Sequence, residues 1–290
     1  MRRDQSTALH SQEETPYQDI STPLPNKKPK PNRAIQDFIS SIHHHRVWLH
    51  LGVLEVKQRY RRSFLGPWWI SMNMLIFIAA MGLIFSRILS QNVAEYIPFF
   101  TTGYLLWSFI SSCISESTDL FKANIGLIKQ VKLPYNLYVL KFFTRNILFL
   151  AHNFVVYVLV MVFFQKNPGW NCLYAIPGML LLILNLYWIC LLVAIISTRF
   201  RDMVPIITNI LQIFFFITPI SWMPKLLGQD SLIVKINPFV YFLESIRQPL
   251  LGHSPPLNLW IINGSMAIVG LYMSFRLFNA VRSRIAFWID

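Results

Sequence analysis

A run of cationic side chains stands directly before the first long apolar segment of the chain. Arg59, Arg61 and Arg62 are close neighbours, and the pair Trp68-Trp69 opens the apolar segment that follows. Guanidinium groups bind phosphate well, and tryptophan rings favour the membrane–water interface. The pattern predicts a cationic surface that contacts lipid headgroups or a phosphate. Positive charge that only orients the chain in a membrane is the alternative interpretation.

A second candidate site is the stretch 118–134, whose pattern predicts a short helix between two apolar segments. It combines apolar, polar and basic side chains, among them Phe121, Asn124, Leu127, Ile128 and Lys129. Apolar side chains exposed among positive charges indicate a docking surface for another protein. A helix that rests on the membrane surface is the alternative.

Aromatic residues form a third candidate site, inside the apolar segments. The chain is 15% aromatic, and Tyr104, Trp107 and the run Phe214-Phe215-Phe216 lie in two of these segments. Sugar rings pack their C–H faces on aromatic planes, so an aromatic-lined channel would let a glycan slide without tight binding. Aromatic side chains that face lipid are the alternative, and composition does not separate the two.

Several kinds of catalytic motif are missing from the sequence. There is no Gly-Lys dipeptide, hence no phosphate-cradling G-x-x-x-x-G-K-[ST] loop, and neither H-E-x-x-H nor G-x-S-x-G occurs. The three cysteines form no C-x-x-C pair, and the run His43-His44-His45 has no Cys or carboxylate nearby, so no metal site is predicted. No carboxylate lies at the middle of an apolar segment, which argues against transport driven by protons or sodium.

The composition is that of a membrane protein. Of the 290 residues, 54% are hydrophobic and only 13% are charged, against about 25% charged in soluble domains. The apolar residues collect in blocks of about 20, the length of a helix that crosses a bilayer. The net charge of +13 does not indicate nucleic acid, because the basic residues cluster between the apolar blocks.

These blocks predict an all-α membrane protein with three parts. Residues 1–33 read as a disordered cytoplasmic tail, and residues 34–66 as one amphipathic interface helix with Leu49, Val53, Val56 and Tyr60 on one face. Residues 67–290 hold six predicted spans, with short re-entrant helices in the proline-rich stretch 223–259. The spans are predicted at 68–85, 97–114, 142–164, 174–196, 203–222 and 260–278.

The distribution of basic residues predicts the orientation. With the N-terminus inside, 21 of the 26 Lys and Arg residues fall on the cytoplasmic side. The positive-inside rule then places both termini in the cytoplasm.

Four stretches, in this order along the chain, resemble a known family. They are 59–68; 102–109 continued by 115–117 and 123–129; 199–202 followed by Thr218-Pro219-Ile220; and Asn237-Pro238 with Glu244, Arg247 and Gly252. Together they resemble the polysaccharide-export branch of the type-2 ABC transporter permeases, which export O-antigen, capsule and teichoic acid chains.

The resemblance implies partners and roles that the residues alone do not. Such a permease forms a homodimer in the bacterial inner membrane and binds two copies of a separate ATPase, which holds the ATP and magnesium; this chain would need no cofactor. The segment from Phe121 to Lys129 would be the coupling helix, beside the interface helix that carries Glu55. Trp68, Trp69 and residues 214–216 would line the channel. The outward-side gate would include Trp222, Tyr241, Glu244 and Arg247.

The resemblance also implies a cargo, and two rivals remain. The expected cargo is a glycan on a lipid carrier such as undecaprenyl diphosphate, received at Arg59–Arg62. One rival is a type-2 permease that exports a drug or a small lipid. The other is a membrane-embedded glycosyl- or acyltransferase, for which only His152 and Glu244 could supply a reactive group.

Overall fold

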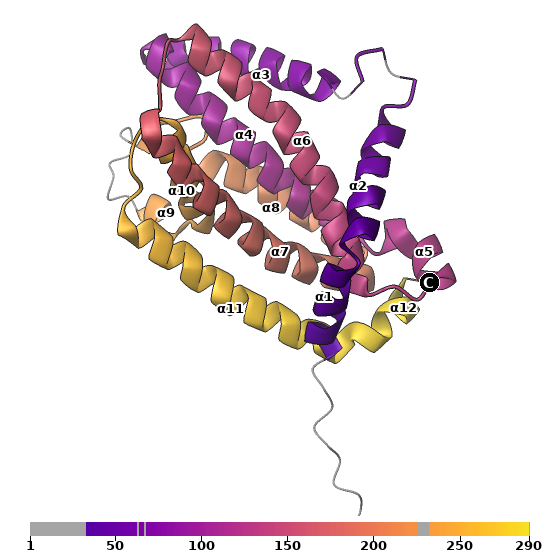
Figure 1. Cartoon of the computed structure of the whole chain (residues 1–290). Coiled ribbons are helices and arrows are strands. Elements are labelled where there is room, and N and C mark those ends of the chain that lie inside the picture. Colours follow the sequence, from indigo (N-terminus) through magenta and orange to yellow (C-terminus); the bar gives the residue numbers. More distant parts are fainter. Residues whose placement is uncertain (1–32, 63, 67, 225–231, 290) are drawn as a thin grey trace, which may run out of the picture. The chain divides into compact units, whose positions relative to one another are not determined.

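The computed structural model describes residues 33–62, 64–66, 68–224 and 232–289, and these residues contain helices and no strands. The all-α prediction is therefore confirmed. The predicted tail lies outside the described residues, apart from Arg33. The α-helices are α1 (Arg33–His43), α2 (His45–Arg59), α3 (Trp68–Ile88), α4 (Val93–Ser117), α5 (Ile125–Gln130), α6 (Tyr135–Phe163), α7 (Ala175–Arg199), α8 (Met203–Ile217), α9 (Leu232–Ile236), α10 (Pro238–Leu250), α11 (Leu257–Val281) and α12 (Ile285–Trp288) (Figure 1).

Five helices in the described residues are long and apolar enough to cross a membrane. They are α3, α4, α6, α7 with the 3-10 turn before it, and α11 with its C-terminal extension. The predicted spans overlap all five, but α6 begins at Tyr135, seven residues before the predicted start, and the last helix continues ten residues past the predicted end at 278. The predicted fifth span differs, because α8 has only 15 residues and is about 22 Å long, against about 30 Å of hydrocarbon.

The most buried of these helices is α4. It packs against α3, α6, α7, α8 and α10, and in its most apolar stretch 72% of the residues are buried. Its first turn is capped by Asn92, whose side chain accepts a hydrogen bond from the backbone N–H of Ala94 at 2.9 Å. Residues of α4 therefore lie at the interfaces with these other helices.

The predicted single interface helix is two helices. His43 and His44 each place Nδ1 within hydrogen-bond distance of a backbone carbonyl four residues earlier, at 2.8 and 2.7 Å, and such contacts compete with regular helix. On the predicted face, Val56 is buried, Val53 and Tyr60 are half-buried and Leu49 is exposed. Gly52 lies against α6, where an added Cβ would meet Thr144 Cβ at 2.7 Å.

The stretch between α8 and α11 contains short helices, as predicted. The longer one, α10, packs on α4, α7 and α11. Asn237 fixes its start by accepting from the backbone N–H of Phe239 at 2.9 Å and donating to Thr218 Oγ1 at 2.8 Å. With 13 residues, α10 is about 20 Å long, too short to cross the hydrocarbon alone.

Candidate functional site

A cluster of five charged residues joins α2, α4 and α6. Lys141 Nζ lies 2.6 Å from Glu55 Oε1, and Arg145 contacts Glu55 at 3.3 Å and Glu116 at 2.6 Å. Arg59 completes the cluster at 3.8 Å from Glu116. The Lys141 side chain is only 8% exposed, and an ammonium group so buried needs a partner. We call these five residues the charge cluster.

Sequence reasoning identified Glu55 and Arg59 but missed the two cations that hold the charge cluster together. Lys141 and Arg145 are four residues apart, so they lie on one face of α6. Two cations on one face of a helix, at the edge of an apolar run, indicate that acidic side chains lie on a helix that packs against that face. That indication was available in the sequence, whereas the identity of the partners was not.

The loop helix before α6 differs from the prediction in one respect. Phe121 is fully buried, with its ring 5.9 Å from that of Tyr135 in an edge-to-face contact. Asn124 is buried too and accepts a hydrogen bond from Lys141 Nζ at 2.7 Å. Neither residue can belong to an exposed docking surface. On α5 itself, Leu127 and Ile128 are half-buried and Lys129 is exposed.

The cationic surface is exposed where the sequence predicted it. Arg61 and Arg62 are exposed, and Trp68 and Trp69 are 56% and 50% exposed at the start of α3. Arg59 instead lies over the ring of Phe149, 5.4 Å from its centroid, as well as contacting the charge cluster.

The predicted aromatic path divides into buried and exposed residues. Trp107 is 4% exposed, because it packs between Phe215 and Phe239. Phe214 and Phe215 are half-buried against the core, whereas Phe216 is 63% exposed. Of the predicted residues on α4 and α8, only Phe216 therefore presents most of its ring at the surface of the chain.

Two of the four predicted gate residues form a buried pair. Arg247, 1% exposed, is paired with Glu244, donates to the carbonyl of Pro219 at 2.6 Å and lies over the ring of Phe99 at 4.1 Å. Trp222 and Tyr241 make separate contacts, donating to the carbonyls of Phe216 and Lys235. Glu244 and Arg247 line a pocket of about 790 Å³.

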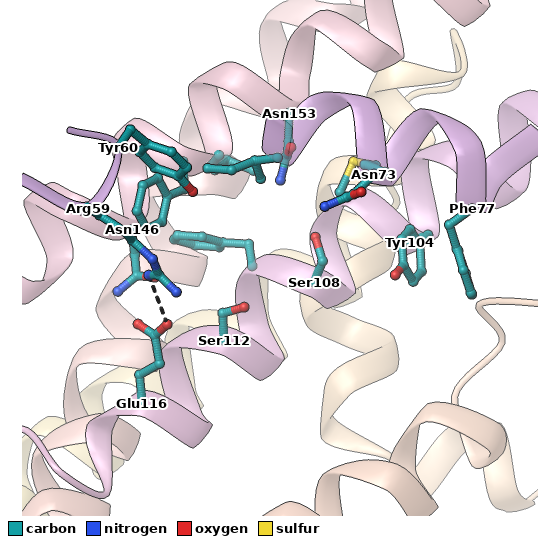
Figure 2. A pocket seen from close by; sticks show the side chains of 15 residues that line it. Arg59, Tyr60, Asn73, Phe77, Tyr104, Ser108, Ser112, Glu116, Asn146 and Asn153 are labelled. Carbon is teal, nitrogen blue, oxygen red and sulfur yellow. Dashed lines mark ion pairs between the residues drawn. The ribbon is translucent and has the colours of Figure 1, made fainter. Parts of the chain in front are cut away.

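A second pocket, of about 430 Å³, lies between α3, α4 and α6 at the end of α2 (Figure 2). Arg59 and Glu116 lie at one end and Phe77 and Tyr104 at the other. Polar side chains line its length, namely Asn73, Ser108, Ser112, Asn146 and Asn153. We call this the amide pocket. The pocket was not predicted, because its polar residues lie on three different spans and no local sequence pattern relates them.

Tyr60 closes the amide pocket beside Arg59. Burial raises the pKa of its hydroxyl above the ordinary value; Arg59 lowers it and Glu116 raises it. The hydroxyl therefore stays protonated at neutral pH and can donate a hydrogen bond into the pocket.

Comparison with known proteins places the chain among transport proteins. The pattern of the ABC-2 type transporter family matches residues 47–251. The chain is also 23% identical over 237 residues to a protein of Myxococcus xanthus described as the O-antigen export system permease protein RfbA. That similarity covers 80% of this chain and 91% of the relative.

Proposed function

Because the chain belongs to the ABC-2 type transporter family, a family of multi-pass membrane permeases that work with an ABC ATPase, we propose that it exports a lipid-linked polysaccharide across the bacterial inner membrane. It is a transport subunit rather than an enzyme. The cargo we propose is an O-antigen or a similar glycan, such as a capsule chain. The observation that carries this proposal is the similarity to an O-antigen export permease over most of both chains.

The working assembly in this proposal is a homodimer with two copies of a separate ATPase, and with both termini of each permease chain in the cytoplasm. ATP and magnesium bind to the ATPase. The orientation is supported by the position of the basic residues, 21 of which fall on the cytoplasmic side. In that orientation the charge cluster and α5 are cytoplasmic, and the Glu244–Arg247 pair lies on the outward side.

In this proposal, movement of the ATPase is transmitted to the permease through α5. Asn124, at the end of the 3-10 turn that leads into α5, contacts Lys141, and Lys141 contacts Glu55 on α2. Arg145 and Glu116 extend the same set of contacts to α4. A displacement of α5 is therefore passed through Asn124 to Lys141 and, through the charge cluster, to α2, α4 and α6 together.

The lipid-linked cargo enters beside the cationic surface. Arg61 and Arg62 are exposed and cationic, which suits the diphosphate of a lipid carrier. Trp68, Trp69 and Phe216 present exposed rings on α3 and α8, and in a homodimer these two helices would line the channel. Aromatic planes along that channel would let the glycan slide outward.

The proposal is tested by purifying the permease in lipid with the ATPase encoded beside it. Co-purification, with hydrolysis stimulated by lipid-linked glycan from the source bacterium, is the expected result. Failure to bind the ATPase would overturn the exporter proposal. Binding without any response to the glycan would instead favour a permease for a drug or a small lipid.

A further inference from the structure

The four residues that follow α8 are attached to the rest of the protein by three side chains. Residues 218–221 are all buried, although they belong to no helix. The three hydrogen bonds run from Asn237 to Thr218 Oγ1 at 2.8 Å, from Arg247 to the carbonyl of Pro219 at 2.6 Å, and from Tyr96 to the carbonyl of Ser221 at 2.5 Å. We call residues 218–221 with these three side chains the α8 anchor.

The side chains of the α8 anchor are themselves held in place. The three donors lie on α4, at the start of α10 and within α10, and none is more than 4% exposed. Arg247 is also paired with Glu244 and lies over the ring of Phe99. The α4 backbone approaches the same segment, because a Cβ added at Gly103 would lie 3.4 Å from the carbonyl oxygen of Ile220. The C-terminal end of α8 is therefore fixed to α4 and α10.

The N-terminal half of α8 is packed much more loosely within the chain. Among the described residues of this helix Leu211 alone is buried, so residues 203–210 contribute no buried side chain. The aromatic contacts of α8 with the core are made by Phe214 and Phe215, close to the α8 anchor. The turn at 200–202, which joins α8 to α7, is exposed at every residue. A helix that is fixed at one end and loosely packed at the other can rotate about its fixed end.

We propose that α8 pivots about the α8 anchor during export, with Tyr96, Asn237 and Arg247 as positioning residues that hold its outward end still. This inference rests on the proposed function, in which α8 lines the channel and the turn at 200–202 is cytoplasmic. Ile206 lies 12 residues before Thr218, about 18 Å along the chain's helical path, so a rotation of about 10° moves it by roughly 3 Å. Arg247 is then a fixed part of the outward side and not a moving gate.

The pivot is tested by spin-label distances in the permease–ATPase complex in lipid nanodiscs. One label is placed at Ile206→Cys or at Ile217→Cys, toward the two ends of α8, and the second at Ile268→Cys; all three side chains are exposed. The second label lies on α11, which packs on α10 and so belongs with the α8 anchor. The half-buried Cys172 is replaced by Ser, and labelled chains are diluted with unlabelled ones so that distances within one chain are measured.

Trapping the ATPase with ATP and vanadate should move only one end of α8. The distance from residue 268 to residue 206 should change by about 3 Å, and the distance to residue 217 should stay the same. Equal changes at both positions, or no change at residue 206, would overturn the pivot, while hydrolysis stimulated by glycan in the same complex would leave the exporter proposal standing. A change at residue 206 alone, without any response to glycan, would keep the pivot and overturn the cargo. Failure to bind the ATPase would overturn both proposals.

Two tyrosine variants test the positioning role of the α8 anchor. Tyr96→Phe removes the hydrogen bond to the carbonyl of Ser221. Tyr157→Phe, the matched control, removes an equivalent bond outside the anchor, because Tyr157 is also buried and donates to the carbonyl of Leu250 at 2.8 Å. Each variant loses one hydroxyl from a buried tyrosine, so both should lower the melting temperature by a similar amount.

Loosening the α8 anchor should change the movement of α8 as well as the stability. In Tyr96→Phe/Thr218→Val, the distance from residue 268 to residue 217 should now change on trapping, and glycan should no longer stimulate hydrolysis while basal hydrolysis persists. Thr218→Ser, which keeps the accepting hydroxyl, and Tyr157→Phe should both behave as the unsubstituted protein does. Should the double variant fail to assemble, Tyr96→Phe alone gives the same comparison. A lower melting temperature without movement at residue 217 would overturn the positioning role.

Discussion

Lys141 on α6 and Glu55 on α2 form an ion pair with 2.6 Å between Nζ and Oε1, and this contact fixes α2 to one of the five helices long and apolar enough to cross a membrane. The Lys141 side chain is almost fully buried, whereas that of Glu55 is about a third exposed. Lys141 also donates to Asn124 beside α5. One ammonium group therefore connects the 3-10 turn before α5 with α2 and α6.

Replacement of Lys141 by Met should uncouple ATP hydrolysis from export. The substitution leaves Glu55 with Arg145 as its remaining partner in the charge cluster, so we expect a loss of about 2 kcal/mol in stability, between the values typical of buried and exposed pairs. Basal hydrolysis by the bound ATPase should persist, while glycan-stimulated hydrolysis and surface glycan fall. Both are measured in the assembled complex and in cells.

A double-mutant cycle with Glu55→Gln isolates the ion pair. If the pair carries the effect, the double variant Glu55→Gln/Lys141→Met should be less impaired than the two single losses added together, because either substitution alone already removes the contact. Additive losses would contradict a direct role for this contact.

Replacement of Arg61 and Arg62 by Ala should reduce export without affecting folding. Both side chains are exposed, and surface substitutions of this kind usually change stability by less than about 0.5 kcal/mol. We expect normal dimer assembly and a lower amount of surface glycan. Arg87→Ala, on the outward side in the proposed orientation, is the control. Undiminished surface glycan in the double variant would refute the proposed contact with the diphosphate.

Charge reversal of Lys129 and truncation of Phe121 should separate docking from folding. Lys129 is exposed on α5, so Lys129→Glu should weaken co-purification of the ATPase at an unchanged melting temperature. Phe121 is fully buried, so Phe121→Ala should cost about 3–5 kcal/mol in stability. The reverse assignment, with a stable Phe121→Ala protein that fails to bind the ATPase, would restore Phe121 to the docking surface.

Asp37 should be essential for attaching α1 to the rest of the protein. Its carboxylate is completely buried and accepts hydrogen bonds from Arg282 and from the backbone N–H groups of Tyr135 and Asn136. Asp37→Ala leaves these donors unpaired, at a cost of about 3 kcal/mol. We expect faster hydrogen exchange in α1 and a lower melting temperature. Arg284→Met, an exposed neighbour of Arg282, is the control; equal effects of both substitutions would refute this role.

The membrane spans could be predicted from sequence because lipid permits few alternatives. A chain that crosses the hydrocarbon must satisfy its backbone internally, so a long apolar run indicates a helix. The same reasoning misjudged the end of α8, because the predicted span continued to residue 222 although the helix ends at Ile217. Pro219 disfavours helical geometry at Thr218, and this local effect is invisible to hydropathy.

The buried polar contacts could not be predicted from the sequence, for a different reason. Asp37 and Arg282 are 245 residues apart and Glu55 and Arg145 are 90 apart, so no local pattern relates them. Phe121 was misplaced because an apolar residue in a polar loop can face outward or pack inward. Its burial depends on tertiary contacts, among them the ring of Tyr135 at the start of α6, and no local pattern predicts these.

The close approach at Gly52 has a mechanical consequence. With no side chain between the α2 backbone and Thr144, rotamer changes cannot absorb a displacement of α2 at that point. The displacement must tilt α6 as a rigid rod. Thr144 lies 19 residues before Phe163, the last residue of α6, so a tilt of about 5° at the contact moves that end, about 28 Å away, by roughly 2.5 Å. In the proposed orientation, a push on α2 at the cytoplasmic side would therefore move the end of α6 on the opposite side of the bilayer.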